Sequence, residues 1–340
     1  MPEIKQRLRH SSDGETGYTR KRMGRYWAYF DEKGERITDR DTIERLNSIG
    51  LPPAYTDAWF CKDSNGHLQA TGVDARGRKQ YRYHPDFREK QDGAKFGGLI
   101  EFGKALPKIR RRVEQDLKRR ALSREAVLAA VVRLLDREYI RVGNEAYARD
   151  NKSFGATTLR RRHLKQTGHG LMMRFAGKHG IVHELKITDT NLKRICKRCQ
   201  DLPGQMLFQY VNGDGEPKPV TSTDVNDYIR EAANADFTAK HFRTWGASVI
   251  AFEQMLKKGE DARITVKTVV EPVAEALGNT PAISRKSYVH PKLLDAVKDD
   301  PRDPLHGMER PSGRKRLSGA EVGFLKFLER RERKQRKRAA

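Results

Sequence analysis

Two hydrophobic periodicities divide this chain, and they predict two kinds of secondary structure. Before about residue 85, apolar and polar residues alternate over short runs, which predicts strands at 26–30, 57–62 and 67–71. An Asn-Gly pair between the last two runs favours a hairpin turn. A single short helix is expected at 39–50, because isoleucine and leucine recur there at helical spacing before a Gly-Leu-Pro-Pro segment.

Beyond about residue 90, the spacing of the apolar residues becomes helical. A long helix is predicted to begin at Ser123, because apolar residues then recur every three or four positions. Further helices are expected after Thr223, at 240–255 and at 266–277, where a glycine ends the pattern. The second part of the chain is therefore expected to be mostly helical.

A strand signal interrupts this helical part. Alternating segments at 171–175 and 181–187 flank an Ala-Gly-Lys-His-Gly sequence, which predicts a hairpin with Lys178 at its tip. We therefore expect an α+β fold with two domains. An antiparallel β-sheet domain would occupy residues 1–88, and a mostly α-helical domain with a small hairpin sheet would occupy residues 89–340.

Composition adds a strong positive charge to this picture. The 340 residues include 69 Lys and Arg against 45 Asp and Glu, which gives a net charge of +24. Such a surface is typical of proteins that bind a polyanion such as nucleic acid. The chain is still 36% hydrophobic, enough for packed cores. We find neither an apolar signal segment near Met1 nor a membrane-spanning apolar run, and we expect a cytoplasmic protein.

The three cysteines predict neither disulfides nor a metal site. Cys61, Cys196 and Cys199 are too few for the framework of a secreted domain. The last two are spaced as a C-x-x-C pair, but no second pair of Cys or His lies at zinc-ligand spacing. We therefore interpret them as two thiols on one helix, and we expect no metal and no cofactor.

Candidate chemistry lies near the C-terminal end, where Tyr288 follows a short basic segment. Thr280 and Pro281 fit the N-cap and the first position of a short helix that ends near this tyrosine. A phenol titrates near pH ~10, so nearby positive charge must stabilise the phenolate before it becomes a nucleophile. Arg285 and Lys286 are only local candidates for that charge, and other helpers are expected elsewhere in the chain.

A second candidate segment, at 76–84, alternates cations and aromatic residues. Strand spacing would place tyrosines on one face and arginines on the other. An ordinary half-exposed strand can have the same pattern, but in so basic a chain we favour nucleic-acid binding. The residues that we expect at this interface are Arg76, Arg78, Tyr81 and Tyr83.

Three more cations are weak signals when each is taken alone. Arg141 follows a predicted buried helix and could be a structural ion-pair partner, and Arg243 stands on a helix face between Phe242 and Trp245. Lys178 follows a glycine, but the sequence lacks the other residues of a Walker phosphate loop, so no ATP site is predicted.

Taken in order, these residues resemble the catalytic residues of a known family. The series Arg141, Lys178, Arg243, Asn279 and Tyr288 is similar to that of the type IB DNA topoisomerases, in the compact form found in poxviruses and bacteria. The resemblance covers that family's catalytic segments at 140–163, 175–184, 239–246 and 277–288, and residues 69–84 are similar to a segment of the bacterial branch.

The resemblance implies a reaction and a role for each of the five residues. Tyr288 would attack the backbone phosphorus and expel a 5'-hydroxyl, leaving a 3'-phosphotyrosine whose religation needs neither ATP nor a metal. Arg141 and Arg243 would hold the nonbridging oxygens, and Lys178 would protonate the departing oxygen. Asn279 departs from the viral and eukaryotic pattern, which has histidine there. An asparagine can donate a hydrogen bond but cannot transfer a proton.

The resemblance also implies a partner and a set of supporting residues. Double-stranded DNA would be enclosed by a monomer, with the β-sheet domain as one half of a clamp and a catalytic domain like that of the tyrosine recombinases and type IB topoisomerases as the other. The protein would be associated with the nucleoid. Besides the residues of the β-sheet domain, backbone contacts or supporting roles are expected for Tyr147, Ser153, Thr158 and Lys240.

Two other functions remain as alternatives. A tyrosine recombinase shares the catalytic residues, but it usually has a histidine three positions before the second arginine, where this chain has Lys240. A noncatalytic DNA-binding protein would have no need of Tyr288. The basic segment at 330–338 is interpreted as a frayed, solvated tail rather than as a dedicated DNA contact.

Overall fold

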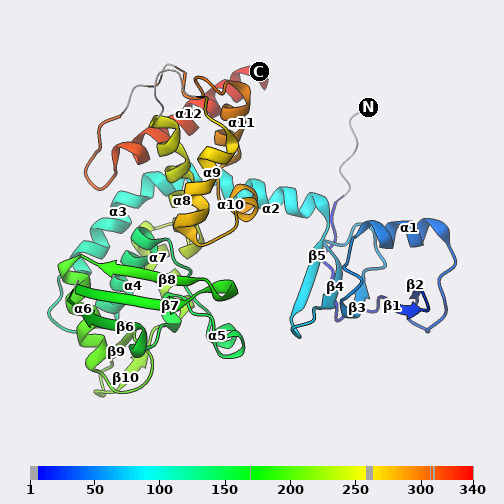
Figure 1. The fold of residues 1–340 in the computed structure, drawn as a ribbon, viewed down its shortest axis with the longest axis horizontal. Helices are drawn as coiled ribbons and strands as arrows, with labels where there is room; N and C mark the ends of the chain where they lie inside the picture. Colours follow the sequence, from blue (N-terminus) through cyan, green and yellow to red (C-terminus); the bar gives the residue numbers. More distant parts are fainter. Residues whose placement is uncertain (1–6, 169, 258–262, 307, 309–310, 340) are drawn as a thin grey trace. The chain divides into compact units, whose positions relative to one another are not determined.

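The structure is a computed structural model that describes residues 7–168, 170–257, 263–306, 308 and 311–339. It divides into two compact units, Met1–Lys95 and Phe96–Ala340, each with a hydrophobic core of its own (Figure 1). Helix α2, Pro85–Gly97, contains the junction of the two units. The boundary predicted between residues 88 and 89 lies within this helix.

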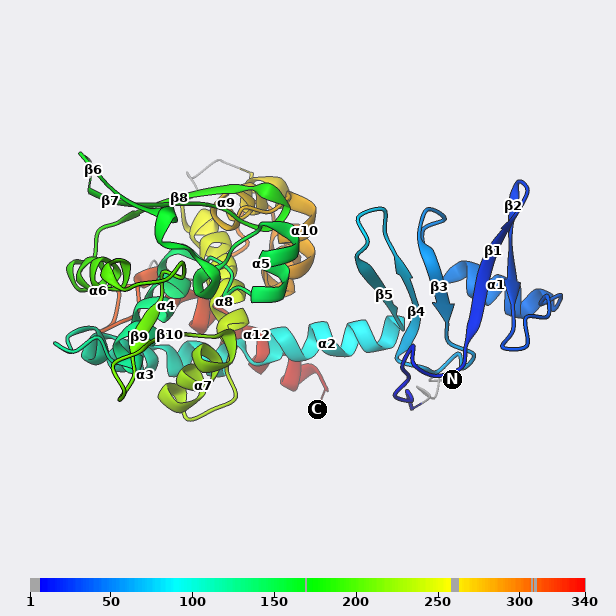
Figure 2. The same cartoon turned by 90° about the horizontal axis from the view of Figure 1, so that it is seen from below.

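The first unit contains an antiparallel sheet with the strand order β2-β1-β3-β4-β5, which can be followed in Figure 2. Helix α1, Arg40–Ser48, contributes the buried Leu46 to a small core that also contains Tyr29, Phe60 and Ala70. The predicted strands and short helix are all present. The strands are β1 Tyr18–Met23, β2 Tyr26–Phe30, β3 Thr56–Phe60, β4 Leu68–Val73 and β5 Lys79–Tyr83.

The second unit is built around helix α4, Arg124–Glu138, which is buried on all sides from Ala126 to Leu135. A helix that is apolar all round must lie inside a core, and α4 packs against helices on several sides. Ser123 caps its N-terminus as predicted. The other helices of this unit are α3 Leu99–Leu117, α5 Glu145–Asn151, α6 Thr190–Asp201, α7 Ser222–Ala233, α8 Ala239–Leu256, α9 Val266–Leu277, α10 Pro281–Ser287, α11 Pro291–Asp299 and α12 Gly319–Ala339.

A small antiparallel sheet lies beside these helices and contains the predicted hairpin. The hairpin strands are β7, Gly170–Ala176, and β8, Val182–Ile187, and β6, Leu164–Thr167, pairs with the outer edge of β7. A second pair is formed by β9, Gln209–Val211, and β10, Pro217–Pro219. The α+β fold class is confirmed, with β6 as a strand that the pattern did not predict.

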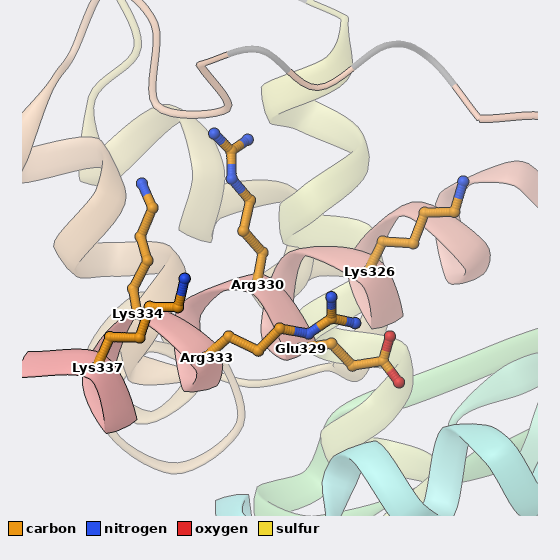
Figure 3. A pocket seen from close by; sticks show the side chains of 6 residues that line it. All are labelled: Lys326, Glu329, Arg330, Arg333, Lys334 and Lys337. Carbon is orange, nitrogen blue, oxygen red and sulfur yellow. The ribbon is translucent and has the colours of Figure 1, made fainter. Parts of the chain in front are cut away.

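The C-terminal end differs from the frayed tail that we expected, because helix α12 continues through the basic segment. Ser318 and Glu321 form a reciprocal capping pair at its start, with bonds of 2.7 and 3.2 Å between backbone N–H groups and side-chain oxygens. Phe324 and Leu328 bury its first turns in the core. Figure 3 shows side chains from the later turns of α12. Five are basic, Lys326, Arg330, Arg333, Lys334 and Lys337, and the acidic Glu329 lies among them.

A buried ion-pair network attaches α12 to the rest of the second unit. Arg110 of α3 donates to Asp136 of α4 at 2.8 Å and to Glu321 of α12 at 2.7 Å, and the Trp245 indole of α8 donates to Glu321 at 3.1 Å. Burial acts to raise the pKa of Glu321, but the bonds and the charge of Arg110 outweigh it and lower the pKa overall. Four helices therefore depend on one carboxylate.

No helix in the described part of the chain is long and apolar enough to cross a membrane.

We predict that Glu321→Gln lowers the free energy of unfolding by about 3 kcal/mol at neutral pH, because it removes one partner of a buried charge. Since the folded-state pKa of Glu321 is lowered, its contribution is complete above the unfolded pKa of about 4.3 and is lost as the pH falls further. Denaturant unfolding at pH 7 and at pH 3 measures both effects. Glu329→Gln, which removes a surface partner of Lys104, is the control and should change little. Equal losses for the two variants would contradict the prediction.

Candidate active site

Arg243 lies at the centre of the candidate site, on α8, with only 5% of its surface exposed. Its guanidinium donates to the carbonyl of Tyr139, the residue that ends α4, and to the carbonyl of Leu277, the last residue of α9, at 3.2 Å. Carbonyls at helix C-termini lack intrahelical partners and attract cations. Arg243 therefore holds two helix ends against a third helix.

The environment of Arg243 keeps part of its guanidinium available. Burial, followed by repulsion from Arg141, lowers the Arg243 pKa to about 10, while Tyr288 acts in the opposite direction. At neutral pH the group is still charged. Its Nε is buried without a hydrogen-bond partner in the described part of the structure. A buried cationic donor with no acceptor is an incomplete site for an anion.

Arg141 and Asn279 form a second pair of donors next to Arg243. Arg141 Nη2 donates to Asn279 Oδ1 at 2.8 Å, which orients the amide so that its NH2 group remains the donor. Asn279 Nδ2 is buried, and no described residue accepts a hydrogen bond from it. Asn279 is placed by Gly278, which ends α9 with a φ of +58° as a left-handed cap. The two arginines and the amide thus present donors that no residue in the described part of the chain uses.

Tyr288 follows the short helix α10, which begins as the sequence predicted, with Thr280 as its N-cap and Pro281 at its first position. Arg243 Cζ lies 5.0 Å from the centroid of the Tyr288 ring, a cation–π distance. The tyrosine is therefore in contact with the buried cation rather than with solvent alone. The phenol and the guanidinium also interact electrostatically, because Tyr288 acts to raise the pKa of Arg243.

Ser248 is a functional candidate that sequence reasoning missed. This fully buried residue of α8 shares its hydroxyl between the carbonyls of Thr244, at 2.8 Å, and Tyr288, at 3.2 Å, and accepts from the His290 amide at 3.0 Å. It therefore anchors the backbone on both sides of Val289 to the helix that carries Arg243. A serine inside a helical pattern carries no sign of this contact, so only the fold could reveal it.

Lys178 lies at the tip of the β7–β8 hairpin, as predicted, in a short 3-10 turn at Lys178–Gly180. The turn is closed by a bond from the Gly177 N–H to the Ile181 carbonyl at 2.7 Å. The lysine is exposed, and no partner within the described residues holds its ammonium group. Four of the five predicted catalytic residues thus form two contacting pairs, Arg141 with Asn279 and Arg243 with Tyr288, while Lys178 extends from a neighbouring hairpin.

The other predicted residues of this unit differ in exposure. Lys240 is exposed on the first turn of α8, while Tyr147, within α5, and Ser153, just after it, are half-buried. Thr158 is 2% exposed, and its hydroxyl accepts from the Gly155 N–H at 2.9 Å and donates to the Gly155 carbonyl at 3.1 Å. Both bonds serve the loop beside Arg141, as a supporting residue would, and a contact of Thr158 with the DNA backbone stays a prediction.

In the first unit, the expected face of β5 carries the tyrosines but not Arg78. Tyr81 and Tyr83 are exposed, and their rings stack with centroids 6.2 Å apart. Arg78 donates to Asp74 at 2.9 and 2.6 Å, and Gln80 donates to the same carboxylate, so Arg78 and Gln80 share the opposite face. Hydrogen bonds from Arg78 lower the pKa of Asp74 to about 2. Arg78 thus stabilises the turn, while its expected contact with DNA stays a prediction, and Arg76 is exposed there.

The two buried thiols of the C-x-x-C pair lie within α6, as the helical interpretation predicted. Burial raises the pKa of Cys199 to about 12 and holds the pKa of Cys196 well above its usual range. Within the described residues, no three His, Cys, Asp or Glu side chains are grouped as metal ligands.

The sequence of this chain is similar to those of known proteins. Residues 84–303 match the model of the eukaryotic DNA topoisomerase I catalytic core, and residues 26–74 match that of the bacterial DNA topoisomerase IB N-terminal domain. The chain is 33% identical to the DNA topoisomerase 1B of Acanthamoeba polyphaga mimivirus over 84% of its own length and 88% of the relative. It is 22% identical to the DNA topoisomerase I of Monkeypox virus over 77% of its own length and 83% of that relative. Since a catalytic-core model matches most of the chain, and the mimivirus relative aligns over nearly the whole of both proteins, this chain belongs to the type IB DNA topoisomerases.

Proposed function

We propose that this topoisomerase relaxes supercoiled duplex DNA by cutting one strand with Tyr288, through a 3'-phosphotyrosyl intermediate, and then religating it without ATP or a metal. One observation carries the proposal: the Tyr288 ring lies against the buried cation Arg243, beside the pair formed by Arg141 and Asn279. A nucleophile and three unused donor groups thus converge on one place. A phosphodiester is the group that this combination fits.

In the cleavage step, Tyr288 Oη forms a bond to phosphorus while the bond from phosphorus to the 5'-oxygen breaks. The phenol proton is lost to solvent, and Arg243 favours that loss by stabilising the phenolate. The Lys178 ammonium gives its proton to the departing oxygen, because an alkoxide is a poor leaving group. Religation runs the same steps in reverse, and the energy of the broken bond is kept in the phosphotyrosine.

The nonbridging oxygens of the phosphate would accept from the donors that the fold leaves unused. Two N–H groups of Arg243 already bond the carbonyls of Tyr139 and Leu277, so its Nε is the free donor. Asn279 Nδ2 is the second, and the remaining N–H groups of Arg141 complete the set. Because these donors are fixed before DNA arrives, little reorganisation is needed when charge develops on the oxygens.

The DNA contacts of the proposal rest on charge and exposure. A net charge of +24, exposed Lys240 beside the site and the stacked Tyr81 and Tyr83 are suited to a duplex. Following the family resemblance, we propose that the protein acts as a monomer that encloses the duplex and that it works on the nucleoid in the cytoplasm.

We predict that Tyr288→Phe abolishes plasmid relaxation and covalent trapping of DNA by detergent, because it removes the attacking oxygen and little else. The wild type should relax supercoiled plasmid with EDTA present and ATP absent. DNA affinity should stay within a few-fold of wild type, which is measured by fluorescence anisotropy. Relaxation by Tyr288→Phe would favour a different nucleophile or a noncatalytic binder, and dependence of the wild type on a metal would contradict the proposed chemistry.

We further predict that Lys178→Ala slows cleavage by ~100-fold or more when the leaving group is an ordinary 5'-oxygen. A 5'-bridging sulfur is a much better leaving group and should restore most of the rate. Single-turnover cleavage of matched oxygen and sulfur substrates makes the comparison, with Arg141→Ala as a variant that sulfur should not rescue. Equal losses on both substrates would remove Lys178 from the general-acid role.

We also predict that Ser248→Ala slows cleavage by about tenfold with nearly unchanged DNA affinity, because the backbone around Tyr288 loses its anchor and the His290 amide loses its acceptor. An unsatisfied buried donor costs about 1–3 kcal/mol. Ser284→Ala is the matched control, since Ser284 is an equally buried serine whose hydroxyl has no partner within the described residues. If both variants cleave at the wild-type rate, Ser248 does not position the nucleophile.

A further inference from the structure

His183 is a half-buried residue of the β7–β8 hairpin that has no part in the reaction described above. It lies opposite Phe175 in the hairpin register, and the two rings stack with centroids 5.1 Å apart and planes inclined by 18°. The stacking fixes the plane of the imidazole. The ring is therefore held on the hairpin in one orientation.

The same ring lies between two glycines that belong to different catalytic segments. A methyl group on Gly177 would lie 2.7 Å from both Cδ2 and Nε2 of His183, and one on Gly278 would lie 3.0 Å from its Cε1. Both distances are too short for a carbon contact, so the ring fills the space that the two glycines leave. Gly177 directly precedes Lys178, and Gly278 directly precedes Asn279.

This packing has a direct consequence for Lys178. The tip of the hairpin is exposed, and the ammonium group of Lys178 has no partner within the described residues. Its reach toward a phosphate bound at Asn279 therefore depends on how the base of the hairpin is held. On one side, the Phe154 N–H donates to the Ala176 carbonyl at 2.8 Å. On the other side, the imidazole ring packs against Gly278 of the Asn279 turn, together with the side chain of Ile181.

The surroundings of His183 favour a neutral ring. Burial lowers the His183 pKa, and the positive charges of Arg243 and Arg141 lower it further. A neutral ring can pack against two backbone segments without adding a charge beside the phosphate site. The imidazole is therefore suited to act as a spacer, and its cationic neighbours disfavour the protonated form that a proton donor would need.

We propose that His183 is a positioning residue: its ring, packed between Gly177 and Gly278, holds the hairpin so that Lys178 reaches the leaving 5'-oxygen while Asn279 binds the same phosphate. The inference rests on the proposed role of Lys178 and extends it to a residue that touches neither the DNA nor the nucleophile. Shape is the property that matters. A flat ring of similar size should therefore replace histidine, and a small side chain should not.

The first test compares His183→Ala with His183→Phe in single-turnover cleavage of the full-length protein. His183→Ala should cleave the 5'-oxygen substrate tenfold or more slowly than wild type, and the 5'-bridging sulfur substrate should recover most of this loss. His183→Phe should stay within about threefold of wild type on both substrates. A loss in His183→Ala that sulfur does not recover would show a merely structural role, and a His183→Phe as slow as His183→Ala would show that the ring nitrogens matter. Either result overturns the proposal.

A double-mutant cycle separates this inference from the proposed role of Lys178. If His183 acts through Lys178, then adding His183→Ala to Lys178→Ala should cost less than about twofold more on the oxygen substrate. If the double variant instead loses the product of the two single losses in cleavage rate, the positioning role is overturned even if Lys178 is the general acid. Failure of sulfur to rescue Lys178→Ala alone would overturn the acid assignment instead, and the positioning of a general acid would fall with it.

A third variant covers the case in which His183→Ala does not fold. Gly177 has a φ of −87°, which alanine adopts without strain, so Gly177→Ala changes only the space against the ring. Its methyl group should displace the imidazole and slow cleavage of the oxygen substrate, again with recovery by sulfur. A wild-type rate for Gly177→Ala would show that the contact between ring and glycine does not position the hairpin.

Discussion

The hydrogen bonds from buried Arg243 to the carbonyls of Tyr139 and Leu277 are the constraint on which this active site depends. They bring the end of α4 and the end of α9 to the same side chain of α8. The chain leaves α4 in a left-handed residue, Tyr139, whose ring occupies the space above Gly246. Arg141 follows two residues later, and Asn279 follows α9 by two residues. One guanidinium thus determines where the segments that carry the two other proposed phosphate ligands begin.

A cation in such a position would be destabilising in an apolar core, and the fold compensates in two ways. Backbone carbonyls at helix ends satisfy part of its donors, and the Tyr288 ring lies against its face. The remaining donor has no partner within the described structure. This arrangement is typical of a site in which part of the stability of the protein has been given up for binding. The ion-pair network around Glu321 differs from this site. Each of its charges, on Arg110, Asp136 and Glu321, has a buried partner, so the network stabilises the fold and leaves no charge for a ligand.

Much of the fold follows from local rules that the sequence displays. Ser123, Thr280 with Pro281, and the Asn-Gly turn all act within a few residues of themselves, so their effects could be predicted. Some residues have local roles that depend on partners the pattern cannot show. Arg78 is held by Asp74, whose carboxylate is one turn away, and Thr158 is buried by the loop that it caps. The basic C-terminal segment was interpreted as a tail because of its charge. The capping pair that begins its helix, Ser318 and Glu321, lies several turns earlier in the chain. Ser248 could not be found at all, since its contacts join α8 to a backbone 40 residues further along the chain.

The choice of asparagine at position 279 also affects how the enzyme responds to its surroundings. A histidine used as a phosphate ligand would change its charge as the pH crosses the physiological range, whereas an amide does not titrate there. The other two ligands are guanidinium groups, and even the lowered Arg243 pKa of about 10 leaves it charged at neutral pH. In the proposed reaction, the affinity of the site for phosphate would therefore change little as the cell becomes more acidic. Resealing of a cut strand would then depend on no phosphate ligand that changes its charge under acid stress.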